Sequence, residues 1–138
     1  MKIMVSACLL GENCKYSGGN NRSEKVLSYI AGHEVIPVCP EVMGGLPTPR
    51  PPAEIANGEV INKNGVSVDA QYRLGAKKAL ALAKERQIDL AILQPRSPSC
   101  GTREIYDGTF SGTKIPGMGV TAALLRENGF RVMGADEL

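Results

Sequence analysis

The sequence predicts a small three-layer α/β domain, built on a mainly parallel sheet of about four strands with one short hairpin. Short apolar segments alternate with segments of helical periodicity, which is the pattern of parallel strands joined by right-handed helical crossovers. The chain has 138 residues, a length that suits a single domain, residues 1–138, with one hydrophobic core.

Two apolar segments on either side of a helix provide the first half of the expected sheet. Residues 2–7 (KIMVSA) form a run typical of a buried strand, and residues 33–38 (HEVIPV) form the second strand. Residues 22–31 carry an apolar stripe and predict a helix that Asn21 caps. Gly32 is expected to end this helix.

A long loop and a hairpin are expected next. Residues 40–57 contain five prolines, a density that excludes a helix or a central strand. Long loops of this kind are usually functional. Segments 59–61 and 66–68 flank an Asn64-Gly65 step, and such a step between two apolar segments predicts a hairpin.

The second half of the chain repeats the alternation of helix and strand. Asp69 can cap an alanine-rich helix that runs to about Arg86, and its alanines indicate close packing on a sheet. Residues 94–119 are rich in glycine and proline and predict a second long loop. The other expected elements are a strand at 89–93, a helix at 120–128 and a strand at 130–133.

Composition indicates which cell compartment and which classes of partner to expect. The formal net charge of +2 is too small to indicate a long nucleic acid or a membrane surface as partner. No apolar run approaches the ~20 residues of a membrane helix, and the first residues lead directly into a strand. We therefore expect a cytoplasmic protein. Thiols stay reduced there, so the four cysteines indicate metal, cluster or catalysis before disulfides.

Three of the cysteines lie where expected strands run out into loops. Cys8 follows the first strand, Cys39 ends the second, and Cys100 lies a few residues past the third. Ligands of open parallel sheets bind beyond these strand ends, so we expect a shared site that takes zinc or an iron–sulfur cluster. Cys14 could close the site, whereas a catalytic centre needs an open position. The alternative is that some of these thiols are buried apolar side chains.

Polar side chains accompany the cysteines. Glu41 follows Cys39 by two residues and could act as general acid or base, or instead cap a turn or pair with Arg50. Ser97 and Ser99 supply hydroxyls or form turns. Arg50 lies among prolines and is interpreted as a substrate clamp or as a staple of the loop.

Stacking platforms and histidine chemistry are limited. The chain has two Phe, four Tyr and no Trp, which leaves Tyr16, Tyr106 and Phe110 as candidates to stack on a base or sugar. His33 is the one histidine and starts the second strand, at the end opposite to the expected crevice. A Cys–His or Ser–His mechanism therefore has little support.

Four motif blocks follow one another along the chain. They are SACLLG at 6–11 with Cys14 and Tyr16, CPE at 39–41 with GL at 45–46 and PR at 49–50, SPSCG at 97–101, and IYDGTF at 105–110. In this order the blocks resemble the thiouracil desulfidase family over essentially the whole chain. The resemblance implies a Rossmann-like enzyme with an oxygen-sensitive [4Fe-4S] cluster. Such an enzyme removes sulfur from a small thiolated nucleobase such as 2-thiouracil, giving uracil and sulfide without redox change.

The resemblance also implies roles for individual residues. Cys8, Cys39 and Cys100 would hold the cluster and leave one iron open, while Cys14 belongs to the pattern and could be a further ligand. The remaining expectations are Glu41 and Ser97 as catalytic residues, with Ser99, Arg50 and Tyr106 in substrate binding.

Two departures from the family pattern, KYS at 15–17 and QPR at 94–96, leave the expected ligands intact and bear on substrate choice. The competing hypotheses are a non-catalytic iron–sulfur protein and a zinc-binding protein closed by all four cysteines.

Overall fold

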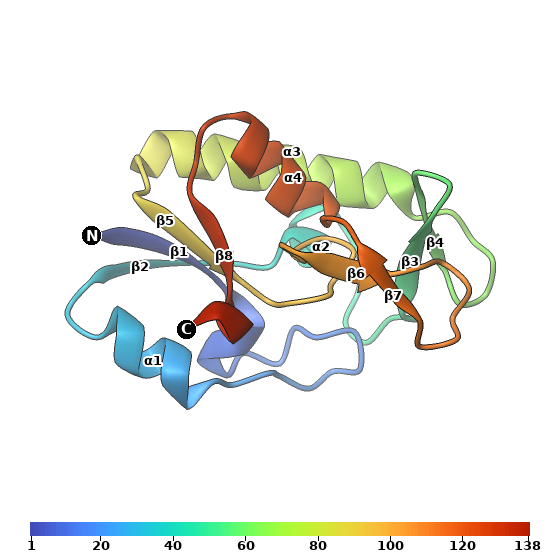
Figure 1. Cartoon of the computed structure of the whole chain (residues 1–138), viewed down its shortest axis with the longest axis horizontal. Helices are drawn as coiled ribbons and strands as arrows, with labels where there is room; N and C mark the ends of the chain where they lie inside the picture. Colours follow the sequence, from blue (N-terminus) through green and yellow to red (C-terminus); the bar gives the residue numbers. More distant parts are fainter.

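Four parallel strands form the central sheet, in the spatial order β2-β1-β5-β8 (Figure 1). The computed structural model describes residues 1–138. The topology confirms the predicted α/β class with a four-stranded parallel sheet. The strands are β1 (Lys2–Ser6), β2 (Glu34–Val38), β5 (Leu90–Leu93) and β8 (Val132–Gly134).

The sheet is buried on both faces, as the continuous apolar strands require. Ile3, Met4 and Val5 of β1 are all fully buried, and their side chains alternate between the two faces. Met4 belongs to the cluster that packs under the helices of one face, while Ile3 and Val5 belong to the cluster on the other. This alternation places helices on both faces of the sheet and gives the three layers that Figure 1 shows one above the other.

Helix α1 (Glu24–Ile30) covers one face of the sheet, and α3 (Asp69–Arg86) and α4 (Val120–Glu127) cover the other. Helix α3 ends at the predicted residue, but Asp69, the predicted cap, is its first residue and Val68 holds the N-cap position. Ala76, Ala79 and Ala83 are buried on its inner face, which explains why small side chains recur there.

The N-cap of α1 differs from the prediction. Ser23 caps the helix, because its Oγ accepts a hydrogen bond from the backbone N–H of Val26 at 3.3 Å. The predicted cap, Asn21, instead directs its side-chain amide at Cys8. The helix therefore begins two residues later than expected, and Asn21 is free to serve the site.

The proline-rich loop contains two short regular elements that were not predicted, helix α2 (Pro40–Met43) and strand β3 (Ala53–Ala56). Pro40 occupies the first turn of α2, where the missing N–H is not needed. The helix lies tightly against α3 at Gly75, where an added Cβ would overlap the carbonyl group of Pro40. Tertiary packing therefore fixes this helix despite its prolines.

The predicted hairpin forms across a different turn, because the strand predicted at 59–61 pairs with the segment before it and not with residues 66–68. Strand β3 pairs antiparallel with β4 (Glu59–Asn62) across Asn57-Gly58, whose φ angles are 51° and 78°. Positive φ at both central positions is what a tight two-residue hairpin turn needs. Asn64 does not adopt a positive φ, so the predicted strand at 66–68 contributes only an isolated bridge.

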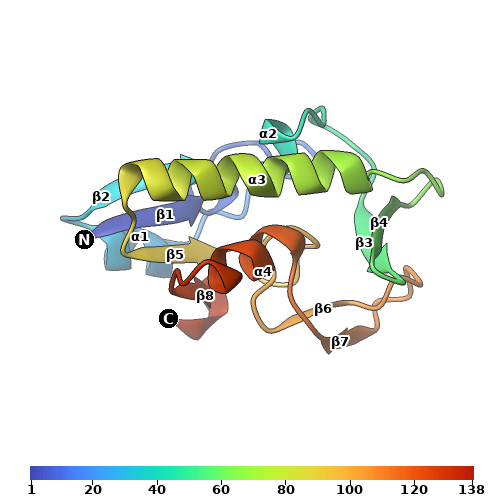
Figure 2. The ribbon, with the colours of Figure 1, turned by 90° about the horizontal axis from the view of Figure 1, so that it is seen from above.

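A second hairpin lies in the loop expected at 94–119 and was missed. It pairs β6 (Glu104–Tyr106) with β7 (Lys114–Pro116). Figures 1 and 2 both place the two hairpins side by side, beyond the carboxyl end of the sheet. They extend the edge at which the expected site lies.

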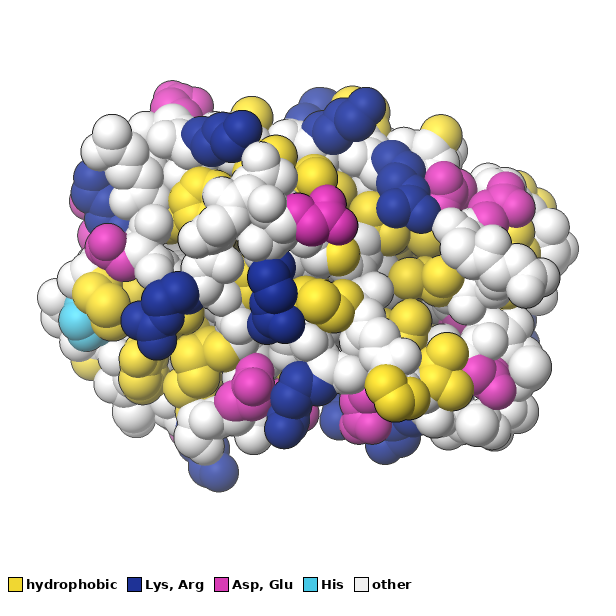
Figure 3. All heavy atoms as spheres, turned by 45° about the horizontal axis from the view of Figure 1, so that its top comes forward, with side chains coloured by type: hydrophobic (Ala, Val, Ile, Leu, Met, Phe, Trp, Pro, Cys, Tyr) yellow, Lys and Arg dark blue, Asp and Glu magenta, His cyan; other side chains and the backbone are white.

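The surface over α3 and α4 has mixed character. Lysine and arginine side chains are interspersed there with acidic and apolar ones (Figure 3), consistent with the small formal net charge of +2. None of the helices combines the length and the apolar character that a membrane crossing requires.

Candidate active site

A cavity of about 550 Å³ lies at the carboxyl ends of β1, β2 and β5. Its wall includes all four cysteines, Cys8, Cys14, Cys39 and Cys100. The topology therefore gathers the thiols that the sequence separates, as the strand-end argument predicts.

Cys8, Cys14 and Cys100 are held in surroundings that disfavour the charged form of their thiols. Burial raises the pKa of Cys100 to about 12, and burial likewise raises the pKa of Cys8. Burial, followed by the charge of the neighbouring Cys39 thiol, raises the pKa of Cys14. A cation among these thiols would reverse this preference, because a coordinated thiol is deprotonated.

The arrangement of the thiols distinguishes between the kinds of metal group. No three of the His, Cys, Asp and Glu side chains converge closely enough to hold a single metal ion. The cysteines instead line the wall of the cavity, where the charge of Cys39 helps to raise the pKa of Cys8 and that of Cys8 helps to raise the pKa of Cys100. Soft donors spaced around a cavity suit a multinuclear iron–sulfur cluster. A closed four-cysteine zinc site is not preformed.

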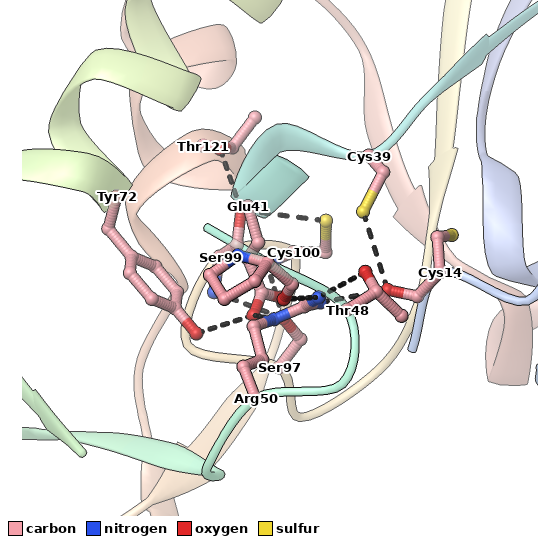
Figure 4. Close-up of polar contacts among 11 residues, drawn as sticks. Cys14, Cys39, Glu41, Thr48, Arg50, Tyr72, Ser97, Ser99, Cys100 and Thr121 are labelled. Atoms are coloured by element: carbon pink, nitrogen blue, oxygen red, sulfur yellow. Dashed lines mark hydrogen bonds and ion pairs between the residues drawn. The ribbon is translucent and has the colours of Figure 1, made fainter. Parts of the chain in front are cut away.

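Glu41 lies in the first turn of α2 and lines the cavity. Its Oε1 accepts hydrogen bonds from the Tyr72 hydroxyl at 2.6 Å and from Nε of Arg50 at 3.2 Å (Figure 4). Its Oε2 makes no hydrogen bond within the protein and is not enclosed. One oxygen is thus fixed by two donors while the other is open to the cavity.

Sequence reasoning missed Tyr72, which lies within the alanine-rich pattern of α3. The side chain is 3% exposed, and its hydroxyl still needs a partner, as buried tyrosines generally do. Burial, followed by the Glu41 charge, raises the pKa of Tyr72, so its hydroxyl remains a donor. The one signal in the sequence that could have identified Tyr72 is that it is a single tyrosine among the alanines of this helix face.

Arg50 acts as the loop staple. Besides Glu41, its guanidinium donates to the carbonyl of Pro47 at 3.1 Å, to Oγ1 of Thr48 at 3.0 Å and to the carbonyl of Cys14 at 2.8 Å. Four of its five N–H groups are therefore used inside the protein. The expected pairing with Glu41 is confirmed. A single N–H group of Arg50 is left to bind a substrate.

The structure brings one of the two predicted serines to the cavity. Ser97 lines it, and its Oγ accepts hydrogen bonds from the backbone N–H groups of Ser99 at 3.0 Å and Cys100 at 3.1 Å. Ser99 is 1% exposed, bonds to Oγ1 of Thr121 at 2.8 Å and lies behind the cavity wall. Ser97 therefore both shapes the turn and retains a hydroxyl proton to donate.

Further side chains complete the wall. Asn21 donates from Nδ2 to Sγ of Cys8 at 3.5 Å, a contact that sequence reasoning missed. Tyr106 lines the cavity, together with Tyr16 and Phe110. Glu54, also missed, lines it from β3.

Comparisons with known proteins agree over almost the full length of the chain. A family model described as 2-thiouracil desulfurase matches residues 3–137. An uncharacterized protein of Bacillus subtilis (strain 168), YbbK, is 44% identical in an alignment 146 residues long, which covers 99% of this chain and 97% of that protein. A solved structure of a [4Fe-4S]-dependent thiouracil desulfidase, TudS, matches with a TM-score of 0.93 at 44% identity, covering 99% of this chain and 92% of that one.

Proposed function

Since the chain belongs to the 2-thiouracil desulfurase family, we propose that it is a [4Fe-4S]-dependent desulfidase that removes sulfur from a thiolated nucleobase of the 2-thiouracil type. The family membership confirms the resemblance indicated by the four motif blocks. The observation that carries the proposal is the convergence of three strand-end thiols, an open carboxylate oxygen and a serine hydroxyl on one cavity.

The proposed reaction is a hydrolysis without net electron transfer. Water adds its oxygen to C2 of the base, the C–S bond breaks, and both protons of the water leave on sulfur as hydrogen sulfide. The product is uracil. Both protons must therefore be removed from the water oxygen and delivered to the departing sulfur, which is a task for a positioned acid–base side chain.

The cluster role falls to Cys8, Cys39 and Cys100, which line the cavity from three strand ends. When bound, the cluster supplies a soft Lewis acid that favours sulfur as its partner and draws electron density from the thiocarbonyl group. Cys14 lies at the same wall, with its carbonyl bonded to Arg50. We assign it to the support of the loop and not to the ligand set.

The protein side chains move the protons. Oε2 of Glu41 takes the two protons of the attacking water from its oxygen, one after the other, and passes each to the departing sulfur, because Oε1 is already held by Tyr72 and Arg50. Ser97 donates a hydrogen bond from its hydroxyl group to the nucleobase, because its oxygen already accepts two backbone hydrogen bonds. We expect Tyr106 to contact the base.

Anaerobic reconstitution followed by assay of sulfide and uracil from 2-thiouracil tests the proposal. We expect a brown protein that releases the two products in equal amounts. Glu41→Gln should keep the cluster and lose turnover by about a hundredfold or more. A fully loaded protein that releases no sulfide from any thiolated base would instead favour a non-catalytic iron–sulfur protein.

We also infer that residues 1–138 act as one functional domain in the cytoplasm. The cysteines, Glu41 and Ser97 come from segments spread along the chain and contribute to the same cavity. Free thiols and an oxygen-sensitive cluster require the reducing conditions of that compartment.

A further inference from the structure

Aromatic side chains are concentrated at the active-site cavity. The chain has four Tyr, two Phe and no Trp, and four of these six residues line the cavity. Tyr72 is engaged with Glu41. Tyr16, Tyr106 and Phe110 therefore remain available to a ligand.

Phe110 is held in place by a buried carboxylate that the proposed chemistry does not use. Glu54 is 9% exposed, and its Oε1 accepts hydrogen bonds from the backbone N–H groups of Gly108 at 3.0 Å and Phe110 at 3.1 Å. Hydrogen bonds to a charged acceptor are stronger than neutral ones. Glu54 on β3 thus fixes the loop between β6 and β7, which lies beside it in space.

The backbone of this loop is specialised. Phe110 has a φ of 56°, a conformation that bulky residues rarely adopt. Gly108 has a φ of 94°, and an added Cβ there would lie 2.8 Å from the carbonyl oxygen of Ile55. Asp107 closes the loop by accepting hydrogen bonds from the backbone and the hydroxyl of Thr109. A strained residue that is held so firmly indicates a functional constraint on its position.

We propose that Glu54 and its loop hold Phe110 as an aromatic wall that stacks on the flat ring of the substrate and makes the cavity selective for planar heterocycles. The inference builds on the proposed function by naming what recognises the ring. Stacking of a base on an aromatic face depends on the π-surface of the base and not on its hydrogen-bonding groups. A planar pyrimidine should therefore bind better than a puckered one with the same polar groups.

Uracil and dihydrouracil provide that comparison, because both carry the same carbonyl and N–H groups and only uracil is flat. Their dissociation constants are measured by calorimetry on the reconstituted holoenzyme, beside KM and kcat for 2-thiouracil. We expect the wild type to prefer uracil. Phe110→Ala should weaken uracil binding and raise KM by about tenfold, leave kcat unchanged and bring the two dissociation constants close together.

Matched variants separate stacking from a general loss of structure. Phe110→Tyr should keep the preference for uracil, and Tyr29→Ala, an exposed aromatic on α1, should change nothing. Glu54→Gln should keep the preference for uracil and raise KM less than Glu54→Ala does, because its amide oxygen can accept the same two N–H groups but without the charge. Glu54→Ala should mimic Phe110→Ala, and the double variant should be no worse than the more affected single variant.

The outcomes are distinct. Unchanged preference for uracil in Phe110→Ala, or additive effects in the double variant, would overturn the inference, and so would a wild type that does not distinguish the two ligands. If the wild type prefers uracil and Phe110→Ala abolishes this preference, but no thiolated base is desulfurised, the role of Phe110 is supported and the proposed reaction is wrong.

Discussion

At the scale of single residues, the feature that organises the chemistry is the asymmetry of Glu41. Two donors, Tyr72 and Arg50, share Oε1, and the side chains of Glu41 and Arg50 are only 17% and 5% exposed. A carboxylate that is fixed through one oxygen presents the other in a defined direction. Reactions that move protons depend on such positioning more than on contact alone.

Tyr72 should matter for turnover although it is not assigned to touch the substrate. In Tyr72→Phe, Glu41 loses one of its two anchors, so we expect kcat to fall by about tenfold, the range for a hydrogen bond to a charged group. KM and iron content should not change. Steady-state kinetics with iron analysis measures this, and Tyr29→Phe is the matched control. A raised KM with normal kcat would contradict the positioning role.

The limits of sequence reasoning are also visible at this scale. The three strand-end cysteines could be predicted to meet, because parallel strands end at one edge of the sheet. Tyr72 could not, because a tyrosine on an apolar helical face has the same pattern whether it fills the core or serves a site. The residue pattern alone made Ser97 and Ser99 equal candidates to supply a hydroxyl or to form a turn. The structure distinguishes them, because Ser97 lines the cavity whereas Ser99 is buried against Thr121.

At the scale of elements, the position of α2 links packing to chemistry. The helix carries Glu41 at its start and touches α3 through glycine, with no room for a side chain between Gly75 and Pro40. Long periodic segments such as α3 were predictable from the sequence, whereas α2 was not. A four-residue helix has no period to detect, and its place depends on contacts distant in sequence.

Gly75→Ala should therefore disturb the site from outside the cavity. The added methyl group overlaps the Pro40 carbonyl, so α2 must move and displace Glu41. We expect a loss of about 1–3 kcal/mol in the free energy of unfolding, typical of overpacking, together with reduced kcat. Urea denaturation and kinetics measure both. Lys78→Ala, on the exposed side of α3, serves as control, and normal kcat in Gly75→Ala would refute the link.

At the scale of the whole molecule, the fold gathers buried thiols that are unfavourable as isolated anions. Burial raises the pKa of Cys8 and of Cys100, and Glu41 lies close enough to add to both effects. Both effects disfavour a thiolate at Cys8 and at Cys100 in the absence of a cation. A bound cationic cluster joins segments that otherwise meet only through packing.

The cluster should therefore stabilise the entire domain. A group that binds the folded state and not the unfolded state raises stability in proportion to the logarithm of its binding strength. We expect the reconstituted protein to unfold at a higher temperature than the apo protein under anaerobic conditions. Exposure to air should remove the difference as the visible absorbance bleaches, and equal Tm values for the two forms would count against a cluster held by the fold.

The most direct test of the central claim, that three strand-end thiols hold a catalytic cluster, is the iron content of the four single Cys→Ser variants after anaerobic reconstitution. We expect Cys8→Ser, Cys39→Ser and Cys100→Ser each to lose the cluster. Cys14→Ser should retain iron at the level of the wild type. A full cluster in any of the first three variants, or its loss in Cys14→Ser, would contradict the account.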